Sequence, residues 1–221
     1  MNSEIIWLLF DWLGTIAFAL SGTLVGMSRR MDLLGVSILS LVTAVGGGMI
    51  RDVLVGMTPP LALQNPTGML LALGTTAAAA WGYRHIAFSK HDTQRFIQLY
   101  IAADAIGLAS FTTTASRIGY AVLGFSPLTV ALLAFITAVG GGIIRDLLAQ
   151  RIPVVLKAEV YGLAAVIGAF AYCISEWLSA ESHDEMSMVI CFSVTLCLRG
   201  IAVWKNWNLP KINRKIRRSF E

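Results

Sequence analysis

The residues best able to do chemistry are six charged side chains that lie within long apolar segments. They are Asp11, Arg51, Asp52, Asp104, Arg145 and Asp146. An ionised group inside a membrane is costly unless it is paired or lines water, so such residues usually serve a function. Their types indicate either a path for ions or polar solutes, or ion pairs that fasten helices together.

Four of these charges belong to a motif that occurs twice. Residues 43–52 and 137–146 are identical at nine of ten positions, at an offset of 94. Each copy has a threonine, three glycines and an Arg-Asp pair: Thr43, Gly46, Gly47, Gly48, Arg51 and Asp52, then Thr137, Gly140, Gly141, Gly142, Arg145 and Asp146. Each glycine lowers helix propensity by about 1 kcal/mol relative to alanine. The triplets therefore predict a kink that exposes carbonyl groups, together with the close helix packing that small residues allow.

The elements that must hold these residues are helices that span a membrane. Hydrophobic residues make up 56% of the 221 and charged residues only 14%, whereas soluble domains average about 25% charged. A spanning helix needs about 20 apolar residues. Seven stretches meet this requirement: 5–27, 33–57, 66–88, 96–116, 127–149, 155–178 and 186–204. The sequence predicts a single all-α membrane domain over residues 1–221.

The duplication extends beyond the motif. An offset of 93 pairs Asp11, Gly14 and Phe18 with Asp104, Gly107 and Phe111. Repeat one therefore covers about 5–88, repeat two covers about 96–178, and a seventh helix at 186–204 stands outside both. Because each repeat has three helices, the two copies enter the membrane from opposite sides. This inverted architecture is typical of transport proteins whose site lies near the membrane midplane.

Basic residues predict the orientation in the membrane. Lys and Arg gather in alternate loops and in the tail 205–221, while the other side has Arg117 and an acidic run at 181–185. The positive-inside rule then places the N-terminus outside and the C-terminus in the cytoplasm. The basic tail favours contact with anionic lipid headgroups over nucleic-acid binding. Arg199 in the seventh helix lies near enough to the cytoplasmic end for its side chain to reach the headgroups.

Depth along the predicted helices indicates which charges pair. Asp11 and Arg51 each lie six residues from the outer end of their helix, or about 9 Å deep at 1.5 Å per residue. By the repeat symmetry, Asp104 and Arg145 meet near the inner face. We therefore predict two ion pairs, Asp11–Arg51 and Asp104–Arg145. Such pairs either brace the helices or take a direct part in solute passage, and the sequence leaves both interpretations open.

Two copies of Gly-Gly-Gly-x-x-Arg-Asp in three-helix repeats, with a seventh helix after them, resemble the trimeric intracellular cation (TRIC) channel family and especially its prokaryotic branch. The resemblance runs from about Asp11 to the end of the seventh helix. It implies a homotrimer in a prokaryotic plasma membrane, with one pore per subunit lined by the kinked second and fifth helices. The implied activity is passive conduction of potassium and other monovalent cations, which bind transiently near the glycine kinks.

A second function stays open because bacterial relatives are sometimes described as glycine transporters. In a channel, glycine carbonyls and the hydroxyls of Thr43 and Thr137 would replace part of the cation's water shell, although helix hydroxyls often bond the preceding turn instead. In a carrier, an arginine would hold the carboxylate of glycine. Unpaired arginines favour the carrier, and fully paired arginines favour the channel.

Other classes of protein fit the sequence less well. A non-transporting scaffold would have tight glycine packing and no water-filled path, and the buried charges in both repeats argue against it. No His, Asp and Ser constellation converges, and no phosphate-binding GxxxxGK[ST] loop occurs. The sequence therefore predicts neither an enzyme nor a resident cofactor or structural metal.

Overall fold

The computed structural model describes residues 3–85, 90–124, 126–157, 160–179, 184–205 and 207, and over these ranges the fold is all-helical. The helices are α1 (Ser3–Ser28), α2 (Leu33–Leu54), α3 (Leu61–Gln64), α4 (Thr67–His85), α5 (Lys90–Leu123), α6 (Pro127–Leu148), the 3-10 helix η1 (Val154–Leu156), α7 (Val160–Leu178) and α8 (Asp184–Trp204). Six of them are long and apolar enough to cross a membrane: α1, α2, α5, α6, α7 and α8. The prediction of an all-α membrane protein is therefore confirmed.

Helix α4 lies where the sequence predicts the third span, 66–88, but it is not among those six helices. Its 19 residues include three glycines and three threonines, which lower its hydropathy. The helix nevertheless packs along α1 and α2 as a third member of repeat one. A count of seven spans stays a prediction.

Local signals account for several helix ends. The carboxylate of Asp32 accepts a hydrogen bond from the Gly35 N–H at 2.7 Å and caps the start of α2, as expected for an aspartate at this position. Pro127 occupies the first turn of α6, where its missing N–H is tolerated. Most other bounds fall within a few residues of the predicted spans, with two exceptions.

The fourth and sixth spans differ from their predictions. Helix α5 is 34 residues long and extends beyond 96–116 at both ends. The predicted helical start at 155 is wrong, because residues 154–156 form the 3-10 helix η1 and α7 begins only at Val160. The physical reason is a hydrogen bond from the Val154 N–H to the Asp146 carboxylate at 2.9 Å, which fixes the chain in a tight turn after α6.

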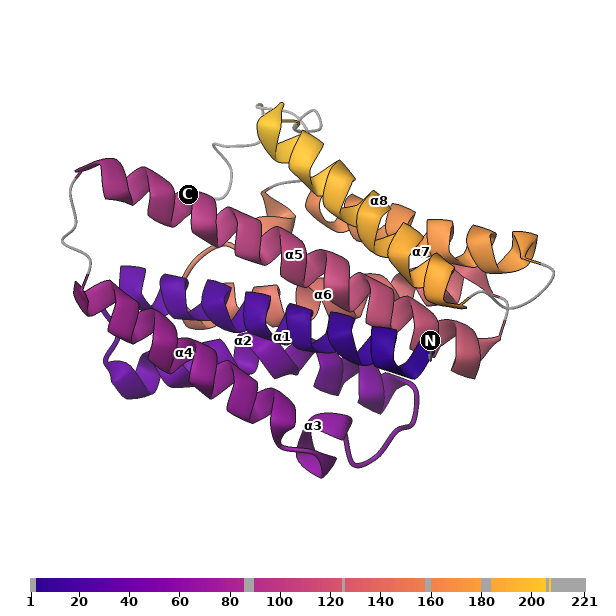
Figure 1. Ribbon diagram of the computed structural model, residues 1–221, viewed down its shortest axis with the longest axis horizontal. Coiled ribbons are helices and arrows are strands. Elements are labelled where there is room, and N and C mark those ends of the chain that lie inside the picture. Colours follow the sequence, from indigo (N-terminus) through magenta and orange to yellow (C-terminus); the bar gives the residue numbers. More distant parts are fainter. Residues whose placement is uncertain are drawn as a thin grey trace, which may run out of the picture.

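The long helices form one bundle in which α1 and α5 lie side by side along the middle (Figure 1). Helices α2 and α6 pack against each other and against these two, so the four form the centre of the molecule. Helix α4 covers one side through α1 and α2, while α7 and α8 cover the other through α5. The arrangement brings the two copies of the repeated motif together.

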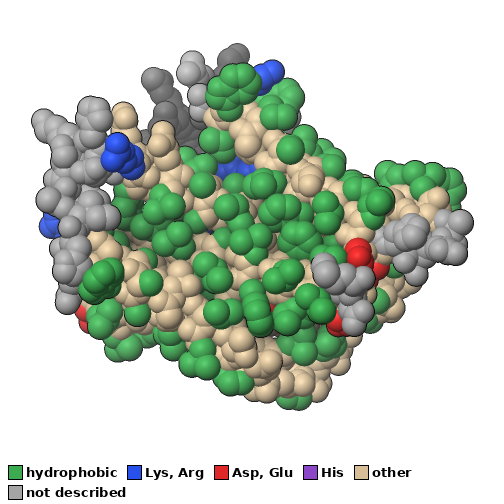
Figure 2. Space-filling model, viewed as in Figure 1, with side chains coloured by type: hydrophobic (Ala, Val, Ile, Leu, Met, Phe, Trp, Pro, Cys, Tyr) green, Lys and Arg blue, Asp and Glu red, His purple; other side chains and the backbone are tan. Residues whose placement is uncertain are grey.

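The surface is broadly apolar, as a lipid-facing surface should be. Hydrophobic side chains are spread over the whole face shown, and few charged side chains are visible on it (Figure 2). Leu33, Leu34 and Leu128 are among the most exposed, the last at 74%. Apolar side chains this exposed are stable when lipid tails rather than water surround them.

Candidate functional site

Helices α2 and α6 cross in backbone contact at the glycine triplets. A Cβ atom placed on Gly47 would overlap the carbonyl oxygen of Thr137, and one on Gly141 would overlap the carbonyl oxygen of Thr43. Gly47 and Gly141 are separated by 94 residues, as are Thr43 and Thr137, so the repeat relates one contact to the other. The crossing is therefore symmetric, and any side chain at either position would force the helices apart.

Both helices continue without interruption through residues 46–48 and 140–142. The predicted close packing is confirmed at Gly47 and Gly141. The outer members of the triplets pack less tightly, since a Cβ atom on Gly46 would lie 3.3 Å from Ile144 Cδ1. The triplets do not interrupt either helix, and a kink at the triplets stays a prediction.

The hydroxyls of Thr43 and Thr137 are buried beside the crossing. Thr43 donates its proton to the carbonyl of Leu39 at 2.5 Å, and Thr137 donates to the carbonyl of Leu133 at 2.7 Å. Both hydroxyls therefore bond the preceding helical turn, which is the common behaviour of threonine within helices. Each oxygen keeps a lone pair that can accept a further contact.

Arg145 is the centre of a closed group of side chains that we call the repeat-two cluster (Ser21, Tyr100, Asp104, Arg145 and Asp146). Its Nη1 donates to Asp104 Oδ1 at 2.6 Å and to Ser21 Oγ at 2.5 Å. Its Nε donates to Asp146 Oδ1 at 3.0 Å and its Nη2 to the Tyr100 hydroxyl at 3.1 Å. Arg145 is 0% exposed. The predicted Asp104–Arg145 ion pair is confirmed.

The corresponding repeat-one cluster (Asp11, Arg51, Asp52 and Thr114) is assembled differently. Nε and Nη2 of Arg51 both donate to Asp52 Oδ1, at 2.9 and 2.7 Å, while Nη1 reaches Thr114 Oγ1 only at 3.5 Å. Among the side chains that the structure describes, Asp52 is the ion-pair partner of Arg51. Asp11 interacts with both of them at longer range. The predicted Asp11–Arg51 ion pair is wrong.

The two repeats also differ in the residue that lies beside the arginine. Tyr100 corresponds to Trp7 at the offset of 93. A tyrosine hydroxyl accepts a hydrogen bond from arginine, whereas an indole N–H can only donate. Trp7 instead donates to the carbonyl of Thr114 at 3.4 Å. Arg51 therefore lacks a counterpart of the contact between Arg145 and Tyr100, while both arginines bond the aspartate that follows them.

A cavity of about 150 Å³ lies beside the repeat-one cluster, and Asp11, Arg51, Asp52 and Thr67 are among its lining residues. This volume exceeds the roughly 30 Å³ that one water molecule occupies in the liquid. The equivalent space in repeat two, which Arg145 and Tyr161 border, has no room for a water molecule. One end of the crossing is thus able to hold water, and the other is packed shut.

The two aspartates of the motif have a second role that is the same in both repeats. The free carboxylate oxygen of Asp52 accepts the Leu61 N–H at 2.8 Å, and that of Asp146 accepts the Val154 N–H at 2.9 Å. Each aspartate therefore neutralises its arginine and fixes the segment that follows its helix. The sequence reading missed this role, because a backbone partner eight or nine residues away leaves no sequence pattern.

Two further residues were missed although the sequence carries a signal for them. Ser21 on α1 contacts Arg145 of repeat two, while Thr114 on α5 contacts Arg51 of repeat one. The two hydroxyls are separated by 93 residues, the offset that relates Asp11 to Asp104. Each arginine thus reaches the first helix of the opposite repeat, so the clusters join the repeats together.

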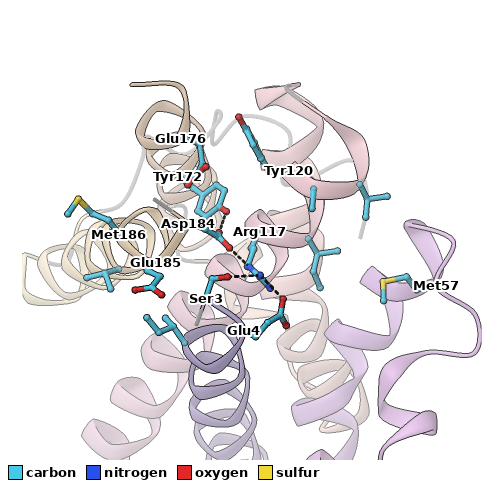
Figure 3. A pocket seen from close by; sticks show the side chains of 15 residues that line it. Ser3, Glu4, Met57, Arg117, Tyr120, Tyr172, Glu176, Asp184, Glu185 and Met186 are labelled. Atoms are coloured by element: carbon cyan, nitrogen blue, oxygen red, sulfur yellow. Dashed lines mark hydrogen bonds and ion pairs between the residues drawn. The ribbon is translucent and has the colours of Figure 1, made fainter. Parts of the chain in front are cut away.

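A larger pocket, of about 1120 Å³, lies at the end of the bundle where α1 and α8 begin (Figure 3). Arg117 donates there to Asp184 at 2.6 Å and to Glu4 at 2.9 Å, and the Tyr172 hydroxyl donates to Asp184 at 2.5 Å. These bonds tie together the ends of α1, α5, α7 and α8. The pocket contains none of the predicted site residues. In the described part of the chain no group of acidic, His or Cys residues has the spacing of a metal site.

Comparison with known proteins places the chain among membrane proteins. The model of the protein family described as Glycine transporter matches residues 8–84 and 101–177, one segment in each repeat. The UPF0126 membrane protein YvgT of Bacillus subtilis is 36% identical over 96% of this chain and 98% of that protein.

Two solved structures have the same fold. A crystal structure of a prokaryotic TRIC channel superposes with a TM-score of 0.84 at 33% identity, over 93% of this chain and 100% of that one. A second, described as the structural basis for conductance through TRIC cation channels, gives a TM-score of 0.80 at 36% identity, over 93% of this chain and 96% of that one.

Proposed function

This chain belongs to the bacterial TRIC family, and from that premise we propose that it is a cation channel. Its relatives are membrane proteins and its own helices are apolar, so the chain is a multi-pass protein of the cell membrane. The proteins of the matching structures are described as cation channels. The proposal transfers that activity to this chain.

The observation that carries the proposal is the pairing of both buried arginines. Arg51 lies 2.7 Å from Asp52, and Arg145 lies 2.6 Å from Asp104. A carrier that held the glycine carboxylate on an arginine would need one of these guanidinium groups to be free. The clusters together hold four aspartates against two arginines, so the formal charge beside the crossing is negative, which favours cations.

The proposed path follows α2 and α6 past their crossing. Asp11 lines the cavity of about 150 Å³ without an ion-pair partner in the described structure, so it is the first carboxylate that an entering cation would meet. Potassium and other monovalent cations would be held there transiently and would pass the triplets by way of exposed carbonyls. Because both triplets are helical and tightly packed, passage requires a kink to open at the crossing.

The proposed assembly is a homotrimer with one path per subunit. Each subunit is a single domain of two inverted repeats and a seventh helix, with α4 as the third of seven spans. In this topology the N-terminus is outside and the Asp11 cavity faces the outer side. The tail 205–221, most of which lies outside the described residues, would contact anionic lipid headgroups on the cytoplasmic side.

Purified protein in liposomes tests the proposal. We expect a potassium-dependent membrane potential, carried by a flux that does not saturate at low millimolar potassium, and no uptake of labelled glycine. The description of the family as Glycine transporter keeps a small amino-acid carrier as the second candidate. Saturable glycine uptake without potassium flux would replace the channel by the carrier. Absence of both fluxes would favour a non-transporting scaffold.

A further inference from the structure

Helix α8 has no counterpart in the repeats, and its contacts show where it acts. It packs on α7 and α5 and touches α1, but in the described structure it makes no extended contact with α2 or α6. Its residue Arg199 is only 7% exposed, so most of its side chain packs inside the bundle, and the contact with headgroups stays a prediction. The guanidinium carbon lies 4.7 Å from the centre of the Tyr161 ring on α7.

Tyr161 connects this contact to the crossing. Its ring is 2% exposed and packs in one core cluster with Phe18, Leu108 and Val139. Its hydroxyl lies 3.5 Å from the position that a Cβ atom on Gly142 would take. The ring borders the space beside Arg145 and Asp146 that cannot hold water. Tyr161 is therefore the side chain that fills the repeat-two end of the crossing.

The other repeat shows what the same position looks like without the ring. At the offset of 94, Tyr161 corresponds to Thr67. Thr67 lines the cavity of about 150 Å³ beside Arg51. A small side chain at this position therefore accompanies an open space, and a tyrosine accompanies a closed one. Repeat one has no helix like α8 to supply a cation at this place.

We propose that Tyr161 is the plug at the inner end of the path and that Arg199 is the residue that positions it. This inference rests on the proposed function. The Nε of Arg199 is buried and has no hydrogen-bond partner in the described structure. A buried cation is stable only when it is compensated, and the face of an aromatic ring provides such compensation. Displacing the ring would leave Arg199 without it, so α8 opposes opening of the plug.

The flux experiment uses four variants in liposomes. Arg199→Gln removes the cation, and Tyr161→Thr installs the residue of repeat one. We expect each to raise potassium flux by about two- to thirty-fold, the factor that a cation–π contact of ordinary strength corresponds to. Tyr161→Phe keeps the ring and should conduct like the wild type. Lys205→Gln, an exposed residue just beyond α8, removes the same charge without touching the ring and is the matched control.

Two results separate positioning from mere support of the fold. The double variant of Arg199→Gln and Tyr161→Thr should conduct no more than Tyr161→Thr alone, because Arg199 acts through the ring. Arg199→Lys should restore most of the closure lost in Arg199→Gln, because it returns a cation. The proposal would be overturned if the flux increase of the double variant equalled the product of the two single increases. It would also be overturned if Arg199→Gln had a lower thermal stability but an unchanged flux.

A readout without flux distinguishes failure of the plug from failure of the channel. Hydroxyl radicals should label Tyr161 weakly in the wild type and several-fold more strongly in Arg199→Gln, as the freed ring becomes accessible to water. Equal, weak labelling in both proteins would overturn the role of Arg199 whatever the protein transports. If the wild type carries no potassium while the labelling still increases, the proposed channel fails and the positioning of Tyr161 by Arg199 stands.

Discussion

Arg51 and Arg145 occupy equivalent places in the two repeats, but their surroundings differ. Arg145 contacts residues of α1 and α5 as well as its chain neighbour Asp146, with contacts between 2.5 and 3.1 Å. Arg51 makes two short contacts, both with Asp52, and one long contact with Thr114. The repeat-two cluster is closed and dry, while the repeat-one cluster borders a cavity.

This difference separates what the duplication preserves from what it does not. The backbone crossing at Gly47 and Gly141 is reciprocal, and so are the hydrogen bonds from the motif aspartates to the following segments. Two side chains near the clusters break the symmetry: Tyr100 faces Arg145 where repeat one has Trp7, and Tyr161 fills a space where repeat one has Thr67. A symmetric backbone thus holds an asymmetric path.

The largest expected effect comes from removing either arginine. Arg145→Gln leaves Asp104 and Asp146 buried without a counter-ion, and breaking a buried pair in this way costs about 3–5 kcal/mol in the free energy of unfolding. Arg51→Gln should cost clearly less, because water in the adjacent cavity can hydrate Asp11 and Asp52. Denaturant titration in detergent measures both. Equal losses would show that the cavity does not relieve the repeat-one cluster.

The next effect concerns the two first-helix aspartates. Asp104→Asn weakens a charge-assisted hydrogen bond of 2.6 Å to a buried arginine and should cost about 1.5–3 kcal/mol. Asp11→Asn removes no ion pair and should change the free energy of unfolding by no more than about 0.5 kcal/mol. The same unfolding titration compares the two.

Potassium flux should rank these aspartate variants in the opposite order. Asp11 is the carboxylate that lines the cavity, so Asp11→Asn should lower the flux while leaving the fold intact. A large stability loss for Asp11→Asn would mean that the Asp11–Arg51 ion pair forms after all. Full flux with unchanged stability would mean that Asp11 takes no part in conduction.

At the glycine crossing the two repeats have equivalent contacts, so equivalent substitutions should lower the free energy of unfolding equally. Gly47→Ala and Gly141→Ala each push a Cβ atom onto a threonine carbonyl of the facing helix, and overpacking of this kind costs about 1–3 kcal/mol. Gly74→Ala on α4 is the matched control, since a Cβ atom there meets open space. Losses in the two crossing variants that differ by more than their error would show that the crossing is not symmetric.

Composition and the internal repeat predicted the positions of the long helices, because both can be read from the types of the residues alone. Apolar stretches of the right length located the long helices, and the offset of 94 related the two motif copies. The start of the sixth span was wrong because a tertiary hydrogen bond from Val154 to Asp146 decides it. No local pattern reports such a bond. Glycine and threonine also lower the hydropathy of α4, so it stays undecided whether this helix is one of the spans.

The site was predictable to the extent that depth and symmetry determine it. Both rules placed Asp104 beside Arg145, which is correct. The same rules placed Asp11 beside Arg51, which is wrong, because symmetry was applied to the charged residues and not to their neighbours. Pairing Trp7 with Tyr100 at the offset of 93 would have shown that one contact of Arg145 has no counterpart at Arg51. The role of Arg199 had no such signal, because its helix lies outside the repeats.

The smallest expected effect tests the two hydroxyls that join the repeats. Ser21→Ala removes a 2.5 Å contact to Arg145 and should cost about 1 kcal/mol. Thr114→Val removes a 3.5 Å contact to Arg51 while keeping the side-chain shape, and should cost no more than about 0.5 kcal/mol. Arg145→Gln provides the control background, in which the cost of Ser21→Ala should largely vanish because its partner is gone. If Ser21→Ala costs as much there as in the wild type, the hydroxyl stabilises α1 by another route, and the repeats are joined by the crossing alone.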